Sequence, residues 1–338
     1  MLISVLRNAL PSIEEVATAS LPDLLAMMRD LGILLGSVKR HGVEPVAVAP
    51  ELEEVLPLIA RRSGMVIPRD TIYHYVLWNP VGPRERLYTG LPMERMLMSA
   101  VRVALPMLST AVDVCTSLDD ATPGELAFAT SVNELATLVG TMRDSMDLVI
   151  ANVGPEFFAR TMRPYFQDIR VGDDTWLGPA AAHVPVALID LRVWASDHAD
   201  DCYLDFVDHS AWYALERWRP LYRDWQRGPS LVSRVVEALE RHPRQDVPYV
   251  INASAEALCR TMRALTVFRG KHLSIAREAY APDTGLYELG SGGGSVALLE
   301  NVMNQARDMA TLVRLNTSGT RRRRTGKPPR GGKPSCEF

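Results

Sequence analysis

A single histidine and a glycine-rich run are the residues of this chain best suited to chemistry. His272 lies in the segment 265–280, which contains no helix breaker except Gly270. At about 3.6 residues per turn, one stripe of the expected helix, with Ile275 beside it, holds Ala264, Phe268, His272, Ala276 and Tyr280. Such a stripe can present one imidazole to a flat metal macrocycle, because a small neighbour lets the plane approach and aromatic rings cover its edge. A histidine in this setting is also commonly a hydrogen-bonded core residue, and the spacing leaves both interpretations open.

The glycine-rich run begins 18 residues after His272 and reads Gly290-Ser291-Gly292-Gly293-Gly294. It lies in an irregular segment, residues 281–295, and a second irregular segment covers residues 170–183. Long loops within a helical protein are frequently functional, and glycines let the backbone itself lie against a ligand. A dinucleotide or phosphate-binding loop is excluded, because no strand precedes the glycines and no Gly-Lys-Ser/Thr follows them.

The elements that must position these residues are expected to be helices. Apolar residues recur with helical spacing along most of the chain, whereas convincing alternating strand patterns are absent. We expect helices over residues 21–39, 91–118 with a bend at Pro106, 122–149, 155–163, 185–198, 203–225, 230–241, 248–280 and 295–315. Five aromatic residues are expected to anchor the 203–225 helix by packing: Trp212, Tyr213, Trp218, Tyr222 and Trp225.

Composition indicates a globular, soluble protein of the reducing cytoplasm. The chain has 338 residues, of which 47% are hydrophobic and 23% charged. No run of about 18 apolar residues suggests a membrane span, and the N-terminus lacks the features of a signal peptide. The four cysteines are far apart and form no Cys-x-x-Cys pair, which argues against a zinc site and a disulfide framework.

Charge is unevenly distributed along the chain. Residues 320–338 hold seven of the 37 basic residues and one of the 40 acidic ones, so the rest carries 30 basic and 39 acidic residues, a net charge of −9. We expect the tail to be disordered and without a specific role, although it could contact a nucleic acid or an acidic partner. The body has no basic stripe with interleaved aromatics, so nucleic-acid binding is not expected as the main function.

Taken together, several segments resemble a known family. Residues 271–277 followed by 290–293 are similar to the iron-ligand region of indoleamine 2,3-dioxygenase and its relatives, the histidine-ligated, haem-dependent aromatic oxygenases. The nearer resemblance is to the monodechloroaminopyrrolnitrin synthase family. Further segments in the same order support it: 28–32, 37–42, 76–80, 88–92, 162–166, 169–172 and 177–179. The resemblance extends from about residue 20 to about residue 315.

The resemblance implies an all-α, indoleamine 2,3-dioxygenase-like fold. It implies a small, reduced N-terminal helical part (residues 1–80) and a large haem-binding helical domain (81–318). The basic tail (319–338), which composition predicts to be disordered, has no counterpart in the family. His272 would ligate the iron of haem b as a neutral imidazole, with its other nitrogen held by an acceptor that the sequence does not identify. Ala181, Gly290 and Gly292 would lie against the haem.

The resemblance also implies roles around the substrate. Tyr280 and Ser291 would line the substrate pocket, with Ser291 also taking part in catalysis, and Phe158 would face the indole ring. Arg163 would bind the substrate carboxylate, or alternatively pin the loop through an ion pair. His74 and Tyr75 fall where the family places its distal pocket. His74 would be a proton shuttle or a polar part of the wall.

The implied function is a haem-dependent oxygenase of secondary metabolism. It would act on tryptophan or a ring-substituted (for example chlorinated) tryptophan, using O2 and an electron donor, to give an aminophenylpyrrole-type product in antibiotic biosynthesis. The alternatives are a dioxygenase or hydroxylase of another aromatic amino acid, a non-catalytic haem-binding protein, and a structural protein whose His272 lies in the core. His183 departs from the family pattern, because the synthase has an acidic residue there. The loop around it is expected beside the distal face of the haem.

Overall fold

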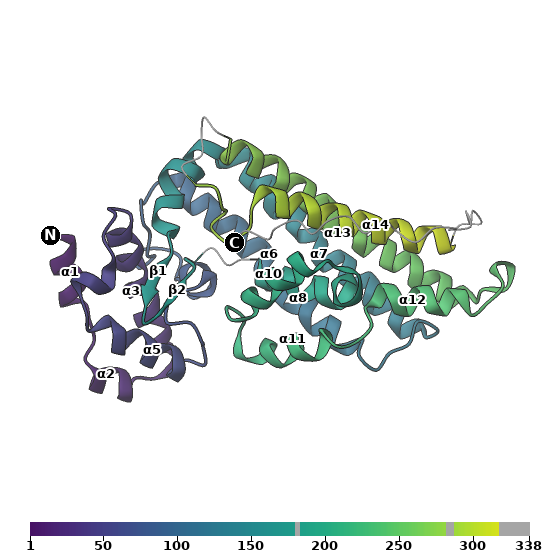
Figure 1. Ribbon diagram of the computed structural model, residues 1–338, viewed down its shortest axis with the longest axis horizontal. Helices are drawn as coiled ribbons and strands as arrows, with labels where there is room; N and C mark the ends of the chain where they lie inside the picture. The colour runs from purple at the N-terminus through teal and green to yellow at the C-terminus, as the bar shows by residue number, and fades with distance from the viewer. Residues whose placement is uncertain (180–182, 282–286, 318–338) are drawn as a thin grey trace.

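The computed structural model describes residues 1–179, 183–281 and 287–317, and it is built almost entirely from helices. Five helices form one end of the molecule (Figure 1): α1 (Leu2–Asn8), α2 (Ile13–Thr18), α3 (Leu21–Lys39), α4 (Pro45–Val48) and α5 (Leu52–Arg62). In the described residues the only sheet is a two-stranded hairpin, β1 (Ile169–Val171) with β2 (Asp174–Trp176). The predicted all-α fold is confirmed.

The helices at this end share a hydrophobic core of their own. α3 begins at Ser20, whose hydroxyl accepts a hydrogen bond from the backbone N–H of Asp23, and ends just before Gly42 at φ 74°. Its apolar face is buried as expected, and it packs with α1, α2 and α5 in one cluster. Ile169 and Val171 of the hairpin join the same cluster. The domain boundaries expected from the sequence stay a prediction.

The larger core is built around four long helices, α6 (Pro92–Ser117), α7 (Leu126–Asn152), α13 (Tyr249–Ala279) and α14 (Val296–Thr317). α13 packs against both α7 and α14, and α6 covers the other side of α7 (Figure 1). Around them lie α8 (Val184–Asp190), α9 (Ser196–His198), α10 (Asp201–Ala211), α11 (Arg219–Trp225) and α12 (Leu231–Glu240). Three short 3-10 turns also occur among the described residues: η3 (Arg163–Phe166), η5 (Glu216–Trp218) and η6 (Arg244–Asp246).

Among the described residues, α6 is the one helix whose length and composition would allow a membrane crossing. In the protein, 44% of that apolar window is buried, and α6 packs against α7 and α8. This burial is typical of a core helix.

Three segments are wound as π-helix: η1 (Tyr73–Leu77), η2 (Phe157–Met162) and η4 (Leu191–Ala195). Each accommodates one more residue per turn than an α-helix would, which changes the direction of the side chains that follow. η1 packs between α3 and α6, and η2 leads directly into η3. The sequence predicted a helix over 155–163 but gave no sign of its wider pitch.

Two expected helices differ in the structure. The prediction of one continuous helix over residues 203–225 is wrong, because α10 ends at Ala211 and α11 begins only at Arg219. Pro220 explains the new start, since a residue without an N–H suits the first turn of a helix. Trp212 is 54% exposed and is no anchor, whereas the other four aromatic residues are buried. The helix expected from residue 122 begins at Leu126, because the Glu125 carboxylate accepts from the N–H of Thr122 at 3.3 Å in a preceding turn.

The predicted irregular segment 170–183 contains the β1–β2 hairpin, which the sequence did not reveal. The strands have three residues each, too few to show an alternating pattern. Gly172 has φ 66° at the turn between them, a backbone conformation that glycine adopts without strain.

Candidate functional site

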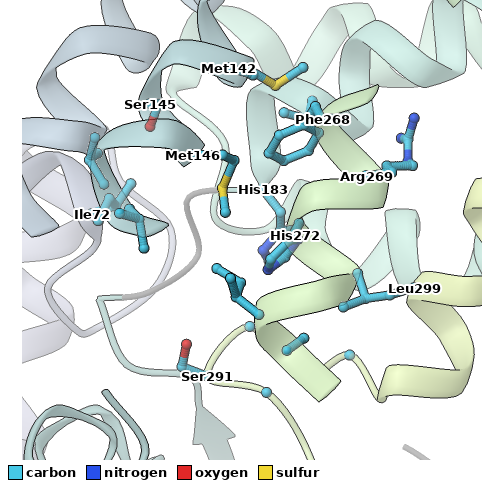
Figure 2. Close-up of a pocket in the computed structure, with 18 of the residues that line it drawn as sticks. Ile72, Met142, Ser145, Met146, His183, Phe268, Arg269, His272, Ser291 and Leu299 are labelled. Atoms are coloured by element: carbon cyan, nitrogen blue, oxygen red, sulfur yellow. The ribbon is translucent and has the colours of Figure 1, made fainter. Parts of the chain in front are cut away.

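A cavity of about 360 Å³ lies between the long helices and is lined mainly by apolar side chains. Its walls come from α6, α7, α8, α10, α13, α14, the π-helices η1 and η2, and the glycine-rich run (Figure 2). Packing of α13 between α7 and α14 therefore brings one face of α13 to an internal space rather than to solvent.

The α13 stripe predicted from the sequence lines this cavity from Phe268 onward. Its predicted members at the wall are Phe268, His272, Ile275 and Ala276, with Tyr280 at the end of the helix, whereas Ala264 lies beyond the cavity and Ala279 joins the wall although the sequence did not single it out. The ring of His272 stacks on Phe268 with centroids 5.8 Å apart. Burial, assisted by the positive charge of Arg269, lowers the pKa of His272 to about 4, so the imidazole is neutral near pH 7. The ring makes no hydrogen bond with the described residues, and it faces the cavity (Figure 2).

One turn before His272, the side chain of Arg269 lies at the cavity and forms a buried ion pair with Asp190. Asp190 is fully buried and also accepts hydrogen bonds from the Tyr203 hydroxyl at 2.6 Å and from Trp194 Nε1 at 2.9 Å. This network joins α13 to α8, η4 and α10. One guanidinium nitrogen of Arg269, Nη1, is buried without a hydrogen-bond partner among the described residues.

A second imidazole, that of His183, faces the same cavity (Figure 2). Its Nε2 lies 2.7 Å from the hydroxyl of Ser210, and its ring packs on Phe206 with centroids 4.9 Å apart. Burial and the proximity of His272 lower the pKa of His183 to about 4, so both rings are neutral near pH 7.

The glycine-rich run meets α13 at a polar edge of the cavity. The Tyr280 hydroxyl lies beside the Arg163 guanidinium and the backbone N–H of Ser291, yet burial outweighs both groups and raises the pKa of Tyr280. Arg163 donates to the carbonyls of Phe166 at 3.1 Å and Leu289 at 3.4 Å. Arg163 is 6% exposed and does not line the cavity, so in this structure it holds the loop in place.

Tyr75 and Phe158 form part of the cavity wall, delivered by η1 and η2. The Tyr75 hydroxyl donates to the Glu94 carboxylate at 2.7 Å. Glu94 is fully buried and is also bound by the N–H groups of Tyr88, Thr89 and Gly90. Because its proton is committed to Glu94, Tyr75 offers the cavity its ring and an oxygen lone pair.

Most of the residues predicted for the site come together. Seven line the cavity: Tyr75, Phe158, His272, Tyr280, Gly290, Ser291 and Gly292. His74 does not line the cavity, because η1 directs its side chain into the protein core. There its Nδ1 accepts a hydrogen bond from the N–H of Thr71 at 3.1 Å, and its ring packs edge-on against Trp78. Ala181 lies outside the described residues.

Sequence reasoning gave no site role to Arg269, and it expected the loop around His183 beside the distal face of the haem. The structure instead brings His183 close to His272, the expected iron ligand. Arg269 precedes His272 by three residues and so shares its helical face, a signal that could have been used. The pairing of Arg269 with Asp190, 79 residues away, has no local signature.

The chain was also compared with models of known protein families. The model described as monodechloroaminopyrrolnitrin synthase PrnB matches residues 14–321, which is nearly the whole chain. The match covers α13, the glycine-rich run and the elements that form every wall of the cavity. The all-α architecture agrees with the indoleamine 2,3-dioxygenase-like fold expected for that family. The chain therefore belongs to the monodechloroaminopyrrolnitrin synthase family.

Proposed function

We propose that this protein is a haem-dependent oxygenase of secondary metabolism that acts on tryptophan or a ring-substituted tryptophan. The observation that carries the proposal is His272, a neutral imidazole that faces an apolar cavity of about 360 Å³ and makes no hydrogen bond with the described residues. The two other imidazoles whose pKa is lowered by burial, His74 and His183, each have one ring nitrogen hydrogen-bonded. Membership of the monodechloroaminopyrrolnitrin synthase family supports the same assignment.

The residues present fit haem b. His272 offers an imidazole nitrogen of the kind that binds haem iron, and Ala276, one turn later, leaves room for a flat ring. The glycine-rich run folds tightly on itself, because the Gly290 N–H donates to the carbonyl of Gly294 at 2.9 Å and a Cβ on Gly290 would lie 3.0 Å from that oxygen. Backbone therefore forms much of this part of the cavity wall.

The side chains around the remaining space suit an aromatic amino acid. Phe158 and the ring of Tyr75 give apolar surface for an indole, and the hydroxyl of Ser291 faces the same space (Figure 2). The hydroxyl of Tyr280 can hydrogen-bond a polar head group. Arg163 stands directly behind Tyr280. We propose that it contributes positive charge toward the substrate carboxylate through this contact while it pins the loop.

When bound, the haem would supply the activation of O2, which no amino-acid side chain provides. The protein would hold the iron through His272, exclude water with the apolar walls and orient the indole ring. The pose set by Phe158, Tyr75 and Ser291 would then decide which bond of the indole is altered. An aminophenylpyrrole-type product from a chlorinated tryptophan is the specific outcome that we propose, with an electron donor reducing the iron.

The test begins with protein expressed in the cytoplasm, where we propose that it resides, with haem supplied. We expect a Soret band that is lost or severely weakened in His272→Ala, and a spectral shift on titration with tryptophan or chlorotryptophan. Incubation of the reduced protein with the same compounds and O2 should give a mass change in the substrate. A wild-type protein that stays colourless would refute haem binding, whereas a coloured protein that leaves every aromatic amino acid unchanged would indicate a non-catalytic haem protein.

A further inference from the structure

His183 is held in one tautomer by a short chain of hydrogen bonds. The Ser210 hydroxyl donates its only proton to the carbonyl of Phe206 at 2.7 Å. At the contact with His183 Nε2, 2.7 Å away, the serine oxygen must therefore accept. Nε2 of His183 carries the ring proton, and Nδ1 is left with a free lone pair.

The ring that carries this lone pair is fixed beside His272. The ring packs against that of Phe206, which in turn stacks on Tyr203 with centroids 6.3 Å apart. Its hydrogen-bond partner Ser210 is only 3% exposed, so solvent does not compete for this contact. His183 also stands at the residue before α8, the helix that ends at Asp190. The two imidazoles face the same space in Figure 2, and each lines the cavity.

An iron-bound histidine needs an acceptor for its second ring nitrogen, because that N–H otherwise stays unpaired in an apolar site. Two hydroxyl groups on the walls nearby are turned toward partners on other elements. Tyr203 donates to Asp190, and Ser145 donates to the carbonyl of Ala100 at 2.7 Å, whereas the imidazole of His183 has a ring nitrogen with no other partner among the described residues. Arg269, the charged side chain nearest on α13, has only donors.

We propose that His183 Nδ1 accepts a hydrogen bond from the ring N–H of His272 that does not bind iron. His183 is then a positioning residue, which orients the His272 ring and increases its electron donation to the iron. The inference rests on the proposed haem ligation by His272. The chain Phe206 carbonyl, Ser210, His183, His272 would connect α10 to the iron through four groups in series.

The test uses the full-length haem protein and reads the iron–histidine bond. In resonance Raman spectra of the ferrous protein, His183→Leu is expected to move the iron–nitrogen stretch to lower wavenumber. Its haem reduction potential should rise, because a less basic imidazole stabilises ferric iron less. Haem affinity should fall by roughly 10- to 100-fold. His183→Gln keeps an acceptor oxygen and should recover part of each change, and His183→Glu should move the stretch to higher wavenumber.

His198 supplies a matched control, because its Nε2 also contacts a serine hydroxyl, that of Ser233, at 2.9 Å but outside the cavity. His198→Leu should leave the stretch and the potential unchanged. An unchanged stretch in His183→Leu would overturn the inference. So would a wild-type ferric protein that is six-coordinate and low-spin and becomes high-spin in that variant, since His183 would then be a second ligand. If His183→Leu does not fold, the Gln and Glu variants give the same comparison. Failure of the wild type to bind haem would refute the proposed function instead.

Discussion

Asp190 shows how one buried carboxylate can organise a site that it does not enter. It accepts from Arg269, Tyr203 and Trp194, side chains that lie on three different elements. A buried ion pair stabilises a fold only when its charges are compensated by hydrogen bonds, and here Asp190 is the partner of the Arg269 Nη2 group. The position of Arg269 at the cavity therefore depends on a residue of α8.

We expect Asp190→Asn to lower the free energy of unfolding by about 3–5 kcal/mol, because it leaves the guanidinium charge buried and unpaired. It should also weaken haem binding, since Arg269 is then free to leave the cavity wall. Urea denaturation measures the first effect and haem titration the second. Tyr203→Phe is the control: it removes one neutral donor to the carboxylate and should cost about 1.5–3 kcal/mol, because the ion pair itself stays intact. If the two variants lost the same unfolding free energy, the charge of Asp190 would contribute nothing beyond an ordinary hydrogen bond.

Residue spacing predicted the part of the site that lies on one helix. Phe268, His272, Ala276 and Tyr280 line the cavity because helical periodicity places them on one face. The resemblance to the family added residues such as Phe158 and Ser291, which lie far away in sequence. Neither route could show that His183 faces the same cavity as His272, because its position depends on how α8 and α10 pack against each other.

At the scale of elements, helix positions were easier to predict than helix pitch. Most long helices begin and end near the residues expected, because caps such as Ser20 and Ser230 leave a local signature. The π-helices leave none, since the extra residue is stabilised by packing elsewhere in the fold. This matters for function, because η1 turns Tyr75 toward the cavity and His74 away from it.

Deletion of Arg160 would test the functional importance of η2. The residue is exposed, so removing it should convert η2 to α-helical pitch and turn Phe158 relative to the rest of the wall. We expect the deleted protein to keep its Soret band but to bind tryptophan roughly 10- to 100-fold more weakly, because a displaced wall no longer fits the ring. A difference-spectrum titration measures this affinity.

Arg160→Ala is the matched control for that deletion. It keeps the residue count and removes a 3.7 Å contact with Glu156 at the surface, which is worth well under about 1 kcal/mol. Tryptophan affinity should stay as in the wild type. If the deletion also leaves the affinity unchanged, the pitch of η2 has no part in substrate binding.

Across the whole molecule, the protein keeps three imidazoles neutral inside its core. Burial lowers the pKa of His74 to about 3 and those of His183 and His272 to about 4. Each must gain a proton on unfolding at mildly acidic pH, so each makes the fold less stable as pH falls. Asp70 acts in the opposite direction, because burial raises its pKa to about 6 and the folded protein holds that proton more tightly.

His74 allows this prediction to be tested apart from any cofactor, because it does not line the cavity. Its pKa is about 3 in the folded protein against an ordinary value of 6.5, so the unfolded chain binds more protons throughout that interval. The stability contributed by neutral His74 is complete above pH 6.5 and is lost steadily as pH falls toward 3. In His74→Gln, the decline of the unfolding free energy with falling pH should be shallower by roughly 1.4 kcal/mol per pH unit. Urea denaturation at several values between pH 6.5 and 4.5 measures how the unfolding free energy of each protein changes with pH, with wild type and variant carrying the same amount of haem.

Parallel slopes for wild type and His74→Gln would mean that His74 is already protonated in the folded protein. Its fully buried ring and the Thr71 N–H that donates to Nδ1 argue against that outcome.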